Sequence, residues 1–177
     1  MNGWLAGSAR PAEPPASDHE AFSRLLVPLI DPAFRLACAI LMDRGEAEDA
    51  VQEAAIRAWK GLHRLRDQCD FRPWFMAIVA NHCRSQYRRR WRSVLKLATI
   101  SGERTDSADL SDDAAEVRCA LGRLSSTDRG LVVLYFYLDR PMPEVAATLG
   151  ISLGAAKTRL HRALRRLRPL LEPEVTR

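Results

Sequence analysis

The stretch PEVAATLGISLGAAKTRLHRALRRL, residues 143–167, decides the fold of the C-terminal part of the chain. Its apolar residues recur at helical spacing and predict a short helix over residues 144–149, followed by a longer one. Gly150 falls between the two, where a tight bend requires a positive φ angle. Ile151 is expected to fill the angle between the helices, and Ser152 to cap the second. This pattern is typical of a helix-turn-helix.

The second of these helices has two different faces. Ala156, Leu160, Leu164 and Leu167 form a predicted buried stripe. The opposite face carries short side chains near its start and long cations further on, as a helix that enters the major groove and holds phosphates requires. The alternative is a helical hairpin with a solvated basic face. The predicted DNA-binding residues are Ser152, Lys157, Thr158, Arg159, His161, Arg162, Arg165 and Arg166.

The N-terminal half also has a helical pattern. Pro28 and Pro32 are expected to divide a first apolar segment. A second helix is predicted over about Glu46–Gly61, where its acidic first turn suits the helix dipole. A third starts near Arg72 with a proline in its first turn, and it runs into a series of arginines. Trp74 on this third helix is expected to lie in the core.

Charge and composition suggest how these segments are divided. The 177 residues include 27 Lys and Arg against 22 Asp and Glu, and the basic runs flank an acidic, polar stretch. We expect an all-α protein: two small helical domains joined by a flexible acidic linker, with the helix-turn-helix in the second. The predicted parts are a disordered leader (1–17), a helical domain (18–96), the linker (97–113) and the helix-turn-helix domain (114–172).

Catalysis, metal binding and membrane insertion are not expected. The cysteines are widely spaced without a Cys-x-x-Cys pair, so we predict no metal site, no cofactor and reduced thiols. No apolar run is long enough to span a membrane and no secretion signal precedes the first helix, which predicts a cytoplasmic protein. A distant alternative is a metal-dependent or thiol enzyme that uses His63, Cys69, His82 and Cys83.

Several stretches of the chain together match one known family. They are Glu46–Glu53 with Trp59, Phe71–Phe75 through Asn81, the arginine run, Val145–Ser152 and Lys157–Ala163. Through them the chain resembles, over about Asp18–Arg92 and Val117–Arg168, the extracytoplasmic-function (ECF) group of bacterial RNA polymerase sigma factors. The resemblance implies a non-catalytic initiation factor that binds core RNA polymerase, recognises the −35 and −10 elements of promoter DNA and assists melting. It also implies an anti-sigma protein as a partner.

The resemblance gives an acidic helix face a role. Asp49, Gln52 and Glu53 stand at positions i, i+3 and i+4 and therefore share one exposed face. The resemblance implies that this face docks on the clamp helices of the beta-prime subunit of polymerase. From the sequence pattern alone, the same residues would be interpreted as a solvated surface. The resemblance also implies that the C-terminal domain reads the −35 element and contacts the beta flap, while the linker threads through polymerase.

The third helix and the loop before it resemble the element that opens the −10 region. A strand separated from its complement needs cations for its phosphates and pockets or flat side chains for its unstacked bases. The implied residues are Arg66, Asp67, Gln68, Asn81, Arg84, Ser85, Tyr87, Arg88 and Arg89.

Some residues depart from the family pattern. Ala55, Ala155-Ala156 and Gly130 replace larger or charged residues, and each is expected to loosen packing by about 1 kcal/mol. The main alternative function is a stand-alone helix-turn-helix regulator, whose first domain binds a ligand or mediates dimerisation. Such a regulator would bind its operator without polymerase.

Overall fold

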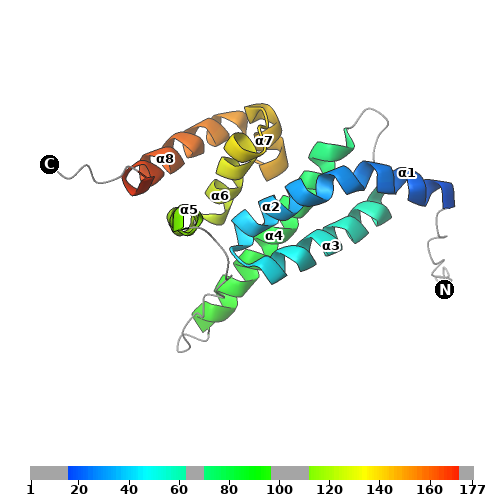
Figure 1. Ribbon diagram of the computed structural model, residues 1–177, viewed down its shortest axis with the longest axis horizontal. Helices are drawn as coiled ribbons and strands as arrows, with labels where there is room; N and C mark the ends of the chain where they lie inside the picture. The colour runs from blue at the N-terminus through cyan, green and yellow to red at the C-terminus, as the bar shows by residue number, and fades with distance from the viewer. Residues whose placement is uncertain (1–15, 63–69, 97–111, 172–177) are drawn as a thin grey trace, which may run out of the picture.

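The computed structural model describes residues 16–62, 70–96 and 112–171, and every regular element within these ranges is a helix (Figure 1). The expected all-α fold is therefore confirmed. The N-terminal helices are α1 (Ala16–Leu26), the 3-10 turn η1 (Val27–Leu29), α2 (Ile30–Leu41), α3 (Arg44–Gly61) and α4 (Phe71–Lys96). The C-terminal helices are α5 (Asp112–Gly122), α6 (Ser126–Val132) with its π-helical continuation η3 (Val133–Tyr137), α7 (Met142–Leu149) and α8 (Leu153–Leu171).

Local signals in the sequence account for the helix boundaries. Pro28 lies in η1, which divides the first segment as predicted. Helix α2 ends at Leu41, and the residue that caps it, Met42, has a left-handed φ of 62°. Asp43 then caps α3, because its carboxylate accepts a hydrogen bond of 2.8 Å from the Glu46 amide. Asp70 accepts a hydrogen bond of 3.0 Å from the Arg72 amide at the start of α4.

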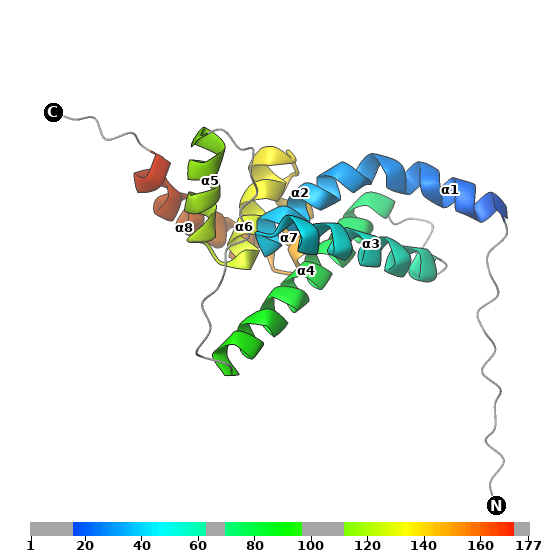
Figure 2. The ribbon, with the colours of Figure 1, turned by 60° about the horizontal axis from the view of Figure 1, so that its bottom comes forward.

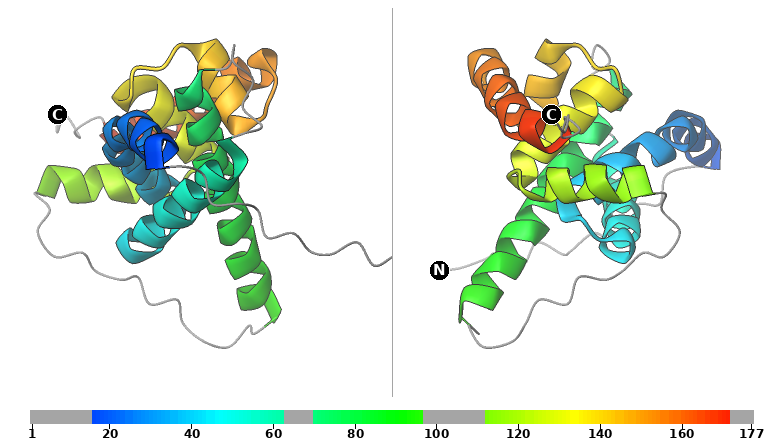
Figure 3. Two further views of the ribbon diagram at one scale, coloured as in Figure 1. Left: turned by 90° about the vertical axis from the view of Figure 1, so that its right-hand side faces the viewer. Right: turned by 60° about the vertical axis from the view of Figure 1, so that its left-hand side comes forward.

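The N-terminal helices α2, α3 and α4 pack on one another, and the C-terminal helices pack directly against them (Figures 1 and 3). Helix α6 contacts α2, and α7 contacts α4. A single buried cluster contains Ile40 and Val79 from the N-terminal half and Leu131 and Leu149 from the C-terminal half. The two helical groups, which we call module 1 (α1–α4) and module 2 (α5–α8), thus share one core in this arrangement.

Gly130 is the residue that lets the modules approach, and the expectation that it loosens packing is wrong. A β-carbon at this position would lie 3.2 Å from Cγ1 of Ile40 and 3.5 Å from Cδ2 of Leu149. Gly130 is buried in α6. A charged side chain there would keep α6 away from α2. Ala156 is also fully buried, and Ala55 packs against the same core.

Helix α8 buries a slightly different stripe from the predicted one. Ala163 and Leu167 are buried in a smaller cluster with Ala120 of α5, whereas Leu164 is 40% exposed. Ala163 is seven residues after Ala156, so the two lie on the same side of the helix, and Leu164 is turned about 100° further round.

Helix α4, with 26 residues, extends beyond the helices that it packs against. Its C-terminal half extends beyond the other helices, as Figure 2 shows. Trp74 near its start is half-buried and packs against the core, as expected. This projecting end carries the last part of the arginine run, whereas Arg84 in the middle of α4 lies at the junction with the C-terminal helices.

Candidate nucleic-acid interface

The turn between α7 and α8 has the geometry of a helix-turn-helix. Gly150 has a φ of 60° and ends α7 in the left-handed conformation. The Ile151 amide donates a hydrogen bond of 3.0 Å to the Ala146 carbonyl, which closes the turn. Ile151 packs against the core, and Ser152 caps α8 by accepting a hydrogen bond of 3.2 Å from the Ala155 amide. The sequence predictions for these residues agree with this geometry.

The outer face of α8 presents the predicted basic residues to solvent. Thr158 is oriented by its hydroxyl, which donates a hydrogen bond of 3.0 Å to the Gly154 carbonyl. Arg159 differs from the rest because it is only half exposed and forms an ion pair with Asp128 of α6. The α8 face can therefore meet a polyanion with several cations, one of which already has a carboxylate partner. The exposed residues are Ser152, Lys157, Thr158, His161, Arg162, Arg165 and Arg166.

The residues predicted to hold the −10 strand fall into separate environments. Arg66, Asp67 and Gln68 lie outside the described residues. Arg88 and Arg89 are exposed on α4, and Ser85 is half-buried.

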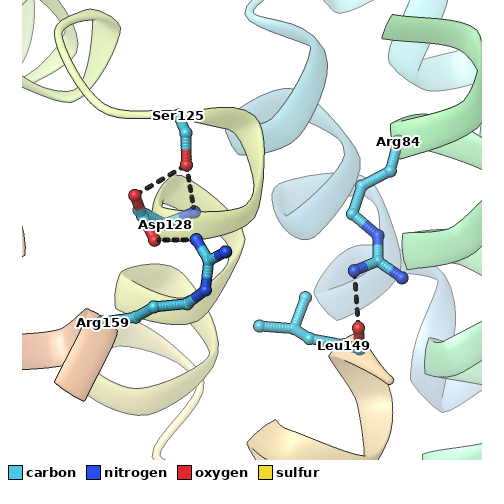
Figure 4. Close-up of polar contacts among 5 residues, drawn as sticks. All are labelled: Arg84, Ser125, Asp128, Leu149 and Arg159. Carbon is cyan, nitrogen blue, oxygen red and sulfur yellow. Dashed lines mark hydrogen bonds and ion pairs between the residues drawn. The ribbon is translucent and has the colours of Figure 1, made fainter. Parts of the chain in front are cut away.

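Arg84 faces module 2. Its Nη1 donates a hydrogen bond of 2.5 Å to the Leu149 carbonyl at the end of α7, and its Nη2 donates one to Oδ1 of Asn81 (Figure 4 draws the first of these). Burial at this junction lowers the pKa of Arg84 from its ordinary value. The side chain that the sequence assigns to phosphates thus bonds to the neighbouring module in this arrangement.

Arg129 is a buried cation that the sequence analysis did not single out. It is 2% exposed and donates to the carbonyls of Ala39 (2.7 Å), Ile40 (2.6 Å) and Leu124 (2.9 Å). Its guanidinium also lies over the ring of Tyr87, 5.1 Å from the centroid. Tyr87, predicted to stack on a base, is therefore packed against module 2. No local sequence signal marks Arg129, because the carbonyls of α2 are distant in sequence.

The acidic face of α3 is open. Asp49 and Gln52 are exposed, and Glu53 is half-buried and forms an ion pair of 2.8 Å with Arg57. Nearby, Glu46 forms an ion pair of 3.1 Å with Arg90 of α4. The predicted polymerase-binding residues thus lie on one helix and remain accessible while the modules are together.

The thiol chemistry of the enzyme alternative finds no support in the described ranges. Cys83 is buried, and burial raises the pKa of its thiol to about 12, so it stays protonated. Burial also lowers the pKa of His82. Residues 16–62, 70–96 and 112–171 contain no group of three or more His, Cys, Asp or Glu that could hold a metal ion; His63 and Cys69 lie outside them.

Within the same described part of the chain, no helix is both long and apolar enough to cross a membrane.

Comparison with known proteins identifies both modules. Residues 25–93 match the Sigma-70 region 2 family, and residues 114–167 match the Sigma-70, region 4 family. Among curated relatives, the ECF RNA polymerase sigma factor SigL of Mycobacterium tuberculosis is 32% identical over 145 residues, which are 78% of this chain and 82% of SigL. The probable sigma factor RfaY of Xanthomonas campestris is 31% identical over 84% of this chain, which spans only 40% of RfaY.

Solved structures show the same relationship. The sigma factor RpoE, in complex with the anti-sigma factor NepR from Bartonella quintana, has a TM-score of 0.76 and 26% identity, covering 89% of this chain and 99% of RpoE. CnrH, in complex with the cytosolic domain of CnrY, has a TM-score of 0.66 and 28% identity, and the match covers 86% of this chain and 88% of CnrH. Region 2 and region 4 in this order define a sigma factor of the sigma-70 class. The chain belongs to the ECF group of RNA polymerase sigma factors, which confirms the resemblance.

Proposed function

We propose that the chain binds core RNA polymerase and directs it to promoters, with α8 reading the −35 element and α4 with its preceding loop contacting the −10 region. The observation that carries this proposal is the capped helix-turn-helix, whose second helix exposes Lys157 and Arg162 on its outer face. In this role polymerase performs the chemistry, and the chain supplies DNA contacts.

The exposed acidic face of α3 supports a distinct contact with polymerase. Asp49 and Gln52 are accessible beside Glu53, and a carboxylate-rich surface would be repelled by DNA phosphates. We assign it to the beta-prime clamp helices, and we assign a contact with the beta flap to module 2. An anti-sigma protein is a further expected partner, since RpoE was solved in complex with the anti-sigma factor NepR and CnrH in complex with the cytosolic domain of CnrY.

The packing of the modules suggests an order of events. Arg84 and Tyr87 contact module 2, while the acidic face of α3 is open. Polymerase can therefore dock on α3 first, and the modules must then separate before Arg84 and Tyr87 can reach the −10 strand. This order gives a physical reason for promoter binding to depend on core polymerase.

A mobility-shift titration with promoter DNA tests the proposal against a stand-alone regulator. A sigma factor shifts the DNA tightly only after core polymerase is added, and Arg162→Ala weakens that shift. Equal affinity of the isolated chain with and without core would favour the regulator. Binding of core by Arg162→Ala provides the control, because Arg162 is far in sequence from α3 and on the outer face of α8.

A further inference from the structure

The ion pair between Asp128 and Arg159 joins α6 to the outer face of α8, the second helix of the helix-turn-helix. Nη1 of Arg159 lies 3.0 Å from Oδ1 of Asp128, and the side chains are 40% and 15% exposed. Figure 4 shows the guanidinium of Arg159 extending from α8 to the carboxylate at the start of α6. The pair is therefore at the edge of the surface that DNA would cover.

The carboxylate is itself held in place. The Ser125 hydroxyl donates a hydrogen bond of 2.7 Å to Oδ2 of Asp128, and the Asp128 amide donates one of 3.2 Å to the same hydroxyl (Figure 4). Ser125 is the N-cap of α6, so this arrangement is part of the helix start. Each carboxylate oxygen thus has a partner, and Asp128 offers Arg159 a fixed anchor.

An anchored guanidinium acts differently from a free one. The ion pair has no net charge, so it adds little to the attraction of phosphates, which the exposed Lys157 and Arg162 can supply. A guanidinium fork has five N–H donors in one plane, and a carboxylate on one of them restricts where the others point. Fixed, directed donors suit the paired acceptors O6 and N7 of a guanine in the major groove.

We infer that Asp128 is a positioning residue that directs Arg159 to a guanine of the −35 element and so sets base preference at that position. This inference rests on the proposed function, because it requires α8 to lie in the −35 duplex. It assigns the residues of α8 to two tasks: Lys157 and Arg162 contribute affinity for any DNA, while Arg159 contributes discrimination.

Binding of holoenzyme to promoters that differ at single −35 base pairs tests this role. Asp128→Asn keeps the shape of the side chain and an acceptor oxygen but removes the charge. We expect discrimination at one G·C pair to fall about 10-fold, while affinity for unrelated DNA rises and the slope of log K against log salt steepens by about one unit. Arg159→Ala should lose discrimination at the same pair, and Asp128→Asn should have no further effect on discrimination in that background.

Two further variants separate positioning from charge and from folding. Glu144→Gln removes one negative charge from α7 of the same module and should leave discrimination unchanged. Ser125→Ala keeps the Asp128 charge but removes its anchor, and should lose part of the discrimination at the same base pair. Urea unfolding of each variant confirms that module 2 is folded.

The outcomes are distinguishable. If Asp128→Asn changes affinity for every −35 variant by the same factor, Asp128 forms only a surface ion pair and the inference is overturned. If wild-type holoenzyme has no preference at any −35 position, the proposed function itself fails. If wild-type holoenzyme has a base preference in the −35 element and Asp128→Asn loses it at one base pair only, both the proposed function and the positioning role of Asp128 are supported.

Discussion

The guanidinium of Arg129 donates a hydrogen bond of 2.6 Å to the carbonyl of Ile40, and so ties α6 of module 2 to the C-terminal end of α2 in module 1. The last carbonyls of a helix have no partner within it and carry the negative end of the helix dipole. A buried cation at this point satisfies them. The closed arrangement of the modules therefore depends on polar contacts, of Arg129 with α2 and of Arg84 with the end of α7, as well as on apolar packing.

Replacement of Arg129 by Met should lower the free energy of unfolding by about 3 kcal/mol or more, because buried carbonyls of α2 lose their donor. Urea unfolding followed by circular dichroism measures the change. Arg123→Met is a matched control: Arg123 is exposed at the end of α5, and its loss should matter by less than about 0.5 kcal/mol. Equal stability of the two variants would contradict the contact.

A large side chain at position 130 should open the modules. Even a β-carbon at position 130 would lie only 3.2 Å from Cγ1 of Ile40. The larger side chain of Gly130→Leu therefore has no room, and α6 must move away from α2. Small-angle X-ray scattering should show a larger radius of gyration for Gly130→Leu than for wild type. Adding Ile40→Ala to the same chain makes room for the leucine and should reduce the radius of gyration again.

The matched control for position 130 is Gly154→Ala. No atom lies within 4 Å of a β-carbon at Gly154 in α8, so this variant should gain up to about 1 kcal/mol of helix stability without expansion. A Gly130→Leu protein as compact as the wild type would show that the modules do not meet at this helix.

Local chemistry explains why some of this arrangement could be predicted and some could not. Gly150 and Ser152 act on neighbouring backbone, so their roles were readable from the sequence. The Ser125-x-x-Asp128 spacing, a capping signal, could have drawn attention to Asp128. Arg129 and Gly130 act on α2, about 90 residues earlier, and no periodicity reports such contacts. The sequence alone therefore predicts a packing defect at Gly130, whereas the structure shows a close contact with Ile40 there.

Reversal of charge on the acidic face of α3 should weaken association with core polymerase. Asp49→Lys with Glu53→Lys is expected to reduce affinity by about 10-fold at low salt and less at high salt, because the contact is electrostatic. Fluorescence anisotropy of labelled chain with core measures it. Glu20→Lys on the exposed face of α1 provides the same kind of charge change away from α3. Unchanged affinity of the double variant would remove α3 from the docking surface.

Stability above pH 9 should depend on Cys83. Burial raises the pKa of its thiol from 9.0 to about 12, so the unfolded chain releases this proton at a lower pH than the folded chain. The contribution is complete below about pH 9 and is lost as the pH rises towards 12, by at most about 1.4 kcal/mol per pH unit. Urea unfolding at pH 8, 9 and 10 should show a steeper decline for wild type than for Cys83→Ala. Parallel declines would mean that the thiol is accessible.

In the proposed function, this chain gives polymerase its promoter preference. The direct measurement is transcription by core polymerase and the purified chain from a library with a randomised region upstream of a reporter. We predict enrichment of two short elements at a fixed spacing, with enrichment of the upstream element lost for Arg159→Ala and core binding retained. Transcripts that begin without any enriched element, at the level of core alone, would contradict it.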